Sequence, residues 1–204
     1  MLSPRIRRLK FDYDLLQKRF AGWPLVRMVG TAGMPPELYR FQYLIKGLYV
    51  AGGGQIQERS EHLLEVNLSL GYPRRAPQCR MLTPVFHPNF DDSSVCIGDF
   101  WAASEGLDDL IIRIGRMISY QEYNTKSPLN GLAAKWAAQN AHLLPVDSRP
   151  VAPPLDDVAA KVNVATAAAS QQPATPSIMQ PAAAAAAAPP TDGSDPWEQK
   201  IVIS

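Results

Sequence analysis

The chain has few cysteines, little net charge and no long apolar run. Its 204 residues include only Cys79 and Cys96, whose wide separation predicts neither a disulfide framework nor a zinc site. The formal net charge is +1, so bulk charge indicates neither nucleic acid nor a membrane surface as partner. No stretch approaches the roughly 20 apolar residues that span a bilayer, and the N-terminal residues lack the apolar run of a signal peptide. We therefore expect a cytoplasmic protein, in which reducing conditions keep Cys96 as a free thiol.

The sequence also lacks a phosphate-binding loop. Its one glycine cluster, Gly52-Gly53-Gly54, is followed by neither a Lys-Ser or Lys-Thr pair nor a helix pattern. The cluster therefore predicts a hairpin turn between two strands.

Periodicity predicts helices around a sheet. Residues 5–20 and 107–121 carry apolar stripes at helical spacing, and in the first of these helices Arg5, Arg8 and Asp12 fall off the stripe. Residues 129–144 predict a third helix that buries four large apolar side chains: Leu132, Trp136, Leu143 and Leu144. Alternation over 39–46 and 64–70 predicts strands, with Cys79 a buried residue of the next one. The order indicates an α+β domain, with a helix, an antiparallel meander of about four strands and two further helices.

Composition changes after the third helix. Residues 145–195 are rich in alanine and proline and poor in large apolar residues, which predicts a disordered linker after a domain of residues 1–144. Residues 196–204 then bring back apolar character at Trp197 and at Ile201-Val202-Ile203. This end is either a short docking motif or a tail without a role.

The stretch of residues 87–101 carries the candidate chemistry. Cys96 follows a polar turn of residues 91–94, and a thiolate is a strong nucleophile that forms thioesters. Seven residues earlier lies Asn89, whose side-chain amide can donate to a developing oxyanion. The turn chemistry predicts that the chain folds back and brings Asn89 near Cys96.

These residues resemble the active site of ubiquitin-conjugating enzymes. That family has a His-Pro-Asn tripeptide, here His87-Pro88-Asn89, followed by a cysteine between apolar residues, here Val95-Cys96-Ile97. Three further matches keep the family's order: Tyr72-Pro73, Trp101 and Ser127-Pro128-Leu129-Asn130. The resemblance covers residues 1–144. The loops on both sides of Cys96 are shorter than the family's, and the family's last helix is missing from the pattern.

The resemblance implies thioester transfer. Cys96 would accept a ubiquitin-like modifier from an activating enzyme and pass it to a lysine of a target protein, without a metal or a small cofactor. Asn89 would steady the oxyanion or its own loop, and His87, Pro88, Tyr72 and Pro73 would be structural. Ser127 lies where the family has a residue that orients the lysine, but it could equally cap a helix that begins at Pro128.

Partner contacts are implied at several other positions. Basic residues crowd the first turns of the N-terminal helix, which reads either as a solvated face or as a contact for the activating enzyme. We expect partner contacts at Arg5, Arg8, Trp101 and Trp197, in a protein that acts as a monomer. High alanine, proline and arginine usage and the shortened loops favour a bacterial member, and by analogy a role in antiviral defence.

Two other functions remain open from the residues. One is a non-catalytic domain of the same fold that only binds ubiquitin-like proteins, although such domains usually lack the cysteine. The other is a hydrolase in which His87 activates Cys96, which requires the two side chains within hydrogen-bond reach.

Overall fold

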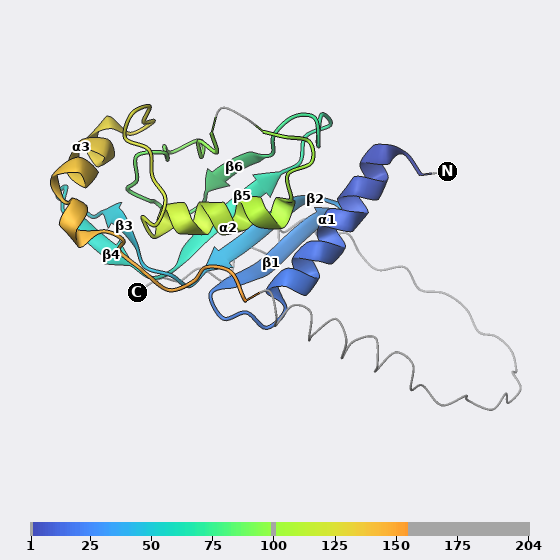
Figure 1. The fold of residues 1–204 in the computed structure, drawn as a ribbon, viewed down its shortest axis with the longest axis horizontal. Helices are drawn as coiled ribbons and strands as arrows, with labels where there is room; N and C mark the ends of the chain where they lie inside the picture. Colours follow the sequence, from blue (N-terminus) through green and yellow to red (C-terminus); the bar gives the residue numbers. More distant parts are fainter. Residues whose placement is uncertain (1, 99–100, 155–204) are drawn as a thin grey trace, which may run out of the picture. The chain divides into compact units, whose positions relative to one another are not determined.

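A computed structural model describes residues 2–98 and 101–154 of the chain. Its centre is a four-stranded antiparallel sheet in the order β1-β2-β5-β6, formed by β1 (Val26–Gly33), β2 (Pro36–Tyr43), β5 (His62–Asn67) and β6 (Gln78–Met81). Figure 1 shows α2 (Leu107–Ile118) across one face of this sheet, while α1 (Pro4–Phe20) packs beside β1, β2 and α2. The predicted α+β order of helix, four-stranded sheet and later helices is confirmed.

A separate hairpin interrupts the meander. The short strands β3 (Gly47–Val50) and β4 (Ile56–Arg59) pair with each other between β2 and β5 and form their own two-stranded sheet. Their turn contains Gly53 at φ +86° and Gly54 at φ +80°, a backbone conformation that glycine adopts without strain. The glycine cluster is therefore the predicted hairpin turn, although the strands of the main sheet do not all follow one another directly.

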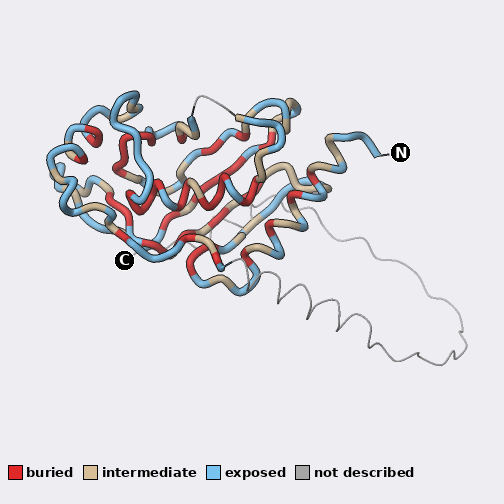
Figure 2. The backbone as a smooth tube through the Cα atoms, in the orientation of Figure 1, coloured by how far each residue is buried: buried red, intermediate tan, exposed pale blue. Residues whose placement is uncertain are grey.

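The core lies between α2 and the sheet. Figure 2 shows that buried residues follow α2 and the central strands, and the hydroxyl of Tyr43 on β2 donates to the carbonyl of Ile111 at 2.8 Å. Gly115 lets the helix approach closely, because a Cβ there would lie 2.9 Å from the Tyr43 ring and 2.5 Å from Val151. Cys79 is buried in this core, as its sequence context predicts.

The third helix buries a different face from the one predicted. Helix α3 (Gly131–Gln139) and the 3-10 turn η1 (Ala141–Leu143) replace the continuous helix expected over 129–144. Leu132 is 77% exposed and Leu143 is 56% exposed, so their predicted burial is wrong. The buried face consists of small residues: Ala133, Ala134 and Ala137. Small side chains let α3 pack closely against Phe86 and Tyr120, whose rings also contact Trp136 of α3 itself.

The chain continues to pack after Leu144, where the sequence pattern ended the domain. Val151 is 2% exposed and belongs to the main core, and its carbonyl accepts a 2.8 Å hydrogen bond from Nε1 of Trp23. The Asp147 carboxylate accepts a 2.8 Å bond from the backbone N–H of Lys46. Residues 145–154 are thus part of the packed domain. The rest of the predicted linker, residues 155–195, and the end segment with Trp197 lie outside the described residues.

No helix follows η1 between residues 144 and 154. No helix within residues 2–98 and 101–154 is long and apolar enough to cross a membrane.

Candidate active site

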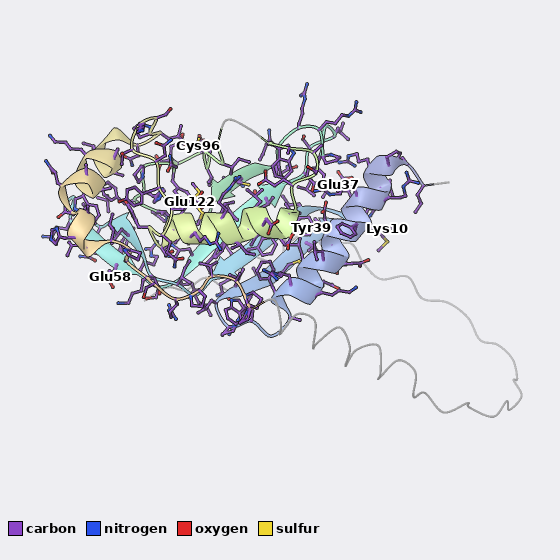
Figure 3. All side chains as sticks on the ribbon, viewed as in Figure 1. Lys10, Glu37, Tyr39, Glu58, Cys96 and Glu122 are labelled. Atoms are coloured by element: carbon purple, nitrogen blue, oxygen red, sulfur yellow. The ribbon has the colours of Figure 1, made fainter. Side chains whose placement is uncertain are left out.

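Cys96 is a half-buried residue on a loop that is joined to β6. The backbone N–H of Val95 donates to the carbonyl of Cys79 on β6 at 2.9 Å, and Val95 also forms an isolated β-bridge with Phe90. One residue further on, the N–H of Cys96 donates to the carbonyl of Asn89 at 2.9 Å. The structure therefore brings Asn89 and Cys96 into direct backbone contact, on the loop where Figure 3 labels Cys96.

The turn between these residues is closed by Asp91. Its Oδ1 accepts hydrogen bonds from the backbone N–H groups of Ser93 (2.7 Å) and Ser94 (2.6 Å), and from both hydroxyls. The N–H of Asp91 in turn donates to the Ser94 carbonyl at 3.1 Å. The bonds from Ser93, joined by those from Ser94, lower the pKa of Asp91. An aspartate in this position fixes the turn by satisfying its backbone donors locally.

The Asn89 side chain is buried and paired with a neighbouring loop. Its Oδ1 accepts a 2.8 Å bond from the N–H of Asn124, and its Nδ2 donates to the Asn124 carbonyl at 3.2 Å. An amide NH₂ group has two hydrogens, so one remains after this contact. The loop role expected for Asn89 is thus visible as two hydrogen bonds, and the second hydrogen of this nitrogen has no partner among the described residues.

His87 is a buried, neutral residue that supports the loop. Its Nδ1 accepts from the backbone N–H of Asn89 at 3.1 Å, and its Nε2 lies 3.2 Å from the Glu122 carbonyl. The ring packs edge-on against Phe90 and Tyr120. Burial lowers the pKa of His87 to about 3, although the Glu122 carbonyl acts in the opposite direction. Both ring nitrogens are used by backbone groups, so this side chain is held for structure.

Ser127 is exposed and does not cap a helix. The N-cap of α3 is Asn130, whose Oδ1 accepts from the N–H of Ala133 at 3.0 Å. The alternative in which Ser127 caps a helix that begins at Pro128 is therefore wrong, because α3 begins at Gly131. The N–H of Asn130 also donates to the carbonyl of Pro88 at 3.0 Å. Asn130 thus ties the start of α3 to the His-Pro-Asn segment.

Trp101 contacts the Tyr72-Pro73 turn through a hydrogen bond and a ring contact. Nε1 of Trp101 donates to the Pro73 carbonyl at 2.6 Å, and the rings of Tyr72 and Trp101 lie 6.1 Å apart. Trp101 is partly buried against the core. Its polar atom is therefore engaged inside the domain, and the partner contact expected for Trp101 stays a prediction.

Arg5 and Arg8, expected to contact a partner, are also engaged internally. Arg5 pairs with Glu37 at 2.9 Å and donates to the carbonyls of Leu68 and Ser69. Arg8 pairs with Asp12 at 2.8 Å and donates to the carbonyls of two loop residues, Ala103 and Glu105. Their cationic groups serve the fold.

Sequence reasoning missed two residues of α1. Asp12 was placed off the apolar stripe but is completely buried. Its position three residues after Leu9 and four before Leu16 is the signal that could have revealed this, since both leucines are buried. Phe11 is 62% exposed and lies near Arg7 and Lys10, which are exposed as well.

No group of three or more histidine, cysteine, aspartate or glutamate side chains suited to a metal ion occurs in residues 2–98 and 101–154. The groups that this loop offers for chemistry are the Cys96 thiol, the amide of Asn89 and the backbone around them. This arrangement can support nucleophilic attack by a thiol and hydrogen bonding to an oxyanion.

A comparison with known families assigns the chain. The model of the ubiquitin-conjugating enzyme family matches residues 37–144. This range is more than half of the 204 residues and contains the sheet from β2 onward, the Cys96 loop, α2 and α3. The chain belongs to the ubiquitin-conjugating enzyme family.

Proposed function

We propose that this protein carries a ubiquitin-like modifier as a thioester on Cys96 and transfers it to a lysine of a target protein. The family acts with ubiquitin-like modifiers and activating enzymes. The observation that carries the proposal is the 2.9 Å bond from the Cys96 N–H to the Asn89 carbonyl. It joins the backbone of partly exposed Cys96 to that of Asn89, whose buried amide nitrogen has one hydrogen without a partner among the described residues.

Charging is an exchange of thioesters. The Cys96 thiolate attacks the carbonyl carbon of the modifier's C-terminus, which the activating enzyme holds on its own cysteine. The new C–S bond forms, the old one breaks, and the activating enzyme's thiolate leaves. No oxidant or metal is required, because the acyl group only changes sulfur atoms.

Transfer uses a neutral lysine amine as the second nucleophile. The amine nitrogen attacks the thioester carbonyl, an isopeptide bond forms, and the Cys96 thiolate leaves. The proton lost by the nitrogen passes to that thiolate or to water. The remaining Nδ2 hydrogen of Asn89 would stabilise the oxyanion formed on the way, while exposed Ser127 would help to place the lysine.

The activating enzyme would contact α1 through Arg7, Lys10 and Phe11. These side chains are exposed, whereas Arg5 and Arg8 are engaged in the fold. An exposed aromatic ring beside two cations fits a partner with an apolar pocket and an acidic rim.

Two observations weigh against the other functions considered. A Cys–His hydrolase needs an imidazole that can take a proton from Cys96, but both nitrogens of His87 bond to backbone groups. A purely non-catalytic domain gives no reason for the partial exposure of Cys96 beside Asn89.

The test is a charging assay. The protein is mixed with its activating enzyme, modifier and ATP and run on a non-reducing gel, where a shifted band that disappears with thiol reductant is expected. In Cys96→Ser the band should resist the reductant, because an oxygen ester replaces the thioester.

Cys79→Ala is the matched control. Burial raises the pKa of Cys79 to about 12 and the thiol is hardly exposed, so this variant should charge normally when folded. A reductant-sensitive band that persists in Cys96→Ala, or is lost in folded Cys79→Ala, contradicts the proposal.

A further inference from the structure

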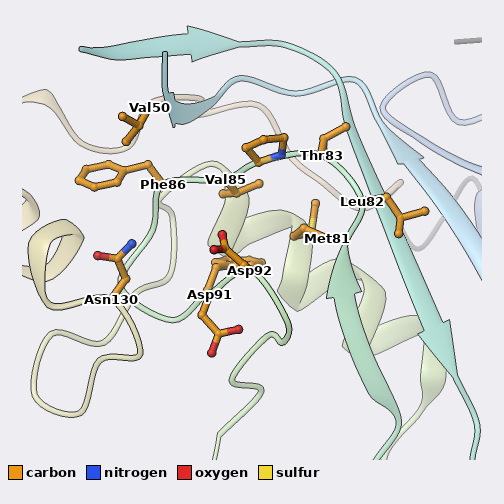
Figure 4. Close-up of a pocket in the computed structure, with 11 residues that line it drawn as sticks. Val50, Met81, Leu82, Thr83, Val85, Phe86, Asp91, Asp92 and Asn130 are labelled. Carbon is orange, nitrogen blue, oxygen red and sulfur yellow. The ribbon is translucent and has the colours of Figure 1, made fainter. Parts of the chain in front are cut away.

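A groove of about 410 Å³ lies beside the Cys96 loop. Its walls come from four separate segments: the end of β3, the stretch after β6, the turn after Asn89 and the start of α3. Figure 4 shows the side chains around it, which include Val50, Leu82, Val85, Asp91, Asp92 and Asn130. We call it the Asp92 groove.

The Asp92 groove shares a loop with the candidate active site. Asp91 and Asp92 belong to the turn that separates Asn89 from Cys96, and that turn closes through the Cys96–Asn89 backbone bond. On the other side, Asn130 is tied to Pro88 by a 3.0 Å bond. A segment lying in the groove would therefore rest against the same loop that carries Cys96.

The walls combine apolar surface with negative charge. Val50 is 46% exposed and Leu82 is 36% exposed, which leaves their methyl groups open to a ligand. Among the lining residues are two carboxylates and no lysine or arginine. An apolar side chain of a ligand would be desolvated against Val50 and Leu82, and a cation would offset the carboxylates.

The two carboxylates of the groove differ in their hydrogen bonds. The Asp91 carboxylate is occupied by Ser93 and Ser94, and Figure 4 shows it directed away from Val85. Asp92 is exposed and makes no hydrogen bond or ion pair with the described residues. In the same view its carboxylate points toward Val85, another residue that lines the groove.

We propose that the Asp92 groove binds the acceptor protein next to the lysine that is modified, and that it selects an apolar residue adjacent to an arginine or second lysine. The inference rests on the proposed transfer function. It assigns part of target selection to this chain itself, through the pairing of Asp92 with a target cation and the contact of Val50 and Leu82 with a target apolar side chain.

The test is discharge of the pre-charged protein onto two peptides. Both peptides have a blocked α-amine, one acceptor lysine and a nearby leucine. The position adjacent to the leucine is arginine in one peptide and glutamate in the other, and arginine itself is not an acceptor. Peptide rates are measured below saturation and divided by the rate with free lysine. We expect the arginine peptide to be favoured about fivefold, the size of an exposed ion pair of about 1 kcal/mol.

Charge reversal at Asp92 should reverse this preference. Asp92→Lys should favour the glutamate peptide, and Leu82→Ser should slow both peptides relative to free lysine. Asp14→Lys, which alters an exposed acid on α1, should keep the wild-type preference. Because Asp92 has no partner within the described residues, its replacement should leave the melting temperature unchanged.

Three outcomes overturn the inference. The first is equal discharge of the wild type onto the two peptides, and the second is a preference for the arginine peptide that survives in Asp92→Lys. The third is an Asp92→Lys variant whose discharge onto free lysine is slowed as much as its discharge onto the arginine peptide. The last result would place the modifier's own tail in the groove. If the protein does not charge at all, the proposed function fails, and anisotropy titration of both labelled peptides onto uncharged protein still decides whether the groove distinguishes them.

Discussion

The hydroxyl of Tyr72 donates a 2.6 Å hydrogen bond to Oδ2 of Asp12, sixty residues earlier in the chain. The same carboxylate accepts from Nε of Arg8 at 2.8 Å, and Arg8 lies over the Tyr72 ring at 5.3 Å. Burial raises the pKa of Asp12, although the bonds from Tyr72 and Arg8 act in the opposite direction. One buried carboxylate therefore connects α1 to the Tyr72-Pro73 turn and, through Arg8, to the loop after Cys96.

Removal of the Tyr72 hydroxyl should destabilise the domain. Tyr72→Phe keeps the ring but leaves the buried Asp12 carboxylate one donor short, at a cost of about 1.5–3 kcal/mol in the free energy of unfolding. Tyr49→Phe is the control, because its hydroxyl bonds to Gln57 at an exposed site. Urea unfolding of both variants measures the difference, and equal losses would show that burial of Asp12 is unimportant.

Substitution of Arg8 should affect the stability of the domain, whereas substitution of Arg7 should affect its charging by the activating enzyme. Arg8→Ala leaves Asp12 without its cation and should lower the free energy of unfolding by about 3 kcal/mol. Arg7→Ala removes an exposed cation, so we expect unchanged stability and a roughly fivefold slower transfer from the activating enzyme. Thermal melting and initial charging rates provide the two readouts. Normal charging in Arg7→Ala would remove this residue from the proposed contact.

Asn89→Ala should slow transfer more than charging. An oxyanion donor typically contributes a factor of about 10²–10³ in rate, so discharge of the thioester onto free lysine should fall by that order. Asn140→Ala deletes another amide that bonds to a backbone carbonyl, in this case that of Trp136 in α3, and should discharge normally. If folded Asn89→Ala discharges at the normal rate, the residue only holds the Asn124 loop.

The sequence could predict the strands, turns and motifs that depend on residues close together in the chain. Alternation located β2 and β5, the glycine cluster located the β3–β4 turn, and the ordered motifs located the Cys96 loop. Each of these rests on residues close together in the chain, where side-chain period and turn chemistry act directly.

The remaining features depend on contacts between distant residues. The hydrogen-bond partner of buried Asp12 is Tyr72, sixty residues away, and the choice of Asn130 over Ser127 as the cap of α3 goes with the bond from Asn130 to Pro88. The inward face of α3 is made of alanines because the large rings of Phe86 and Tyr120 already fill the space opposite it. The Asp92 groove is formed by four segments, none of which carries a signal alone.

Acid should weaken the attachment of residues 145–154. Burial opposes the charged form of Asp147, but hydrogen bonds from Arg149 and from the Lys46 N–H outweigh it and lower the pKa to about 2. Because the folded pKa lies below the unfolded value of about 3.9, this stabilisation is complete above about pH 5 and is lost as the pH falls toward 2. Asp147→Asn should thus cost up to about 2 kcal/mol at pH 7 and progressively less in acid. Urea unfolding at pH 7, 4 and 3 tests this, and a difference that grows in acid contradicts it.

The end of the folded domain can be located by two truncations, after residue 144 and after residue 154. The shorter chain loses the Asp147 contacts and Val151, which packs at Gly115 and accepts the bond from Trp23. Burial of one valine contributes about 1.5–3 kcal/mol, and with the Asp147 contacts we expect a loss of about 4 kcal/mol. Each kcal/mol lost lowers the melting temperature of a domain of this size by about 2–4 °C, so the melting temperature should fall by roughly 10 °C.

The chain ending at residue 154 keeps all of these contacts. The composition of residues 155–195 supplies few large apolar groups to offset backbone ordering, so we expect this chain to melt like the full-length protein. Within it, Val151→Ala should lower the free energy of unfolding by about 1–3 kcal/mol, whereas Val29→Ala, at a 39% exposed position of β1, should change it little. Equal melting of the two truncated chains would place the boundary back at residue 144, because the buried Val151 would then contribute nothing that the shorter chain lacks.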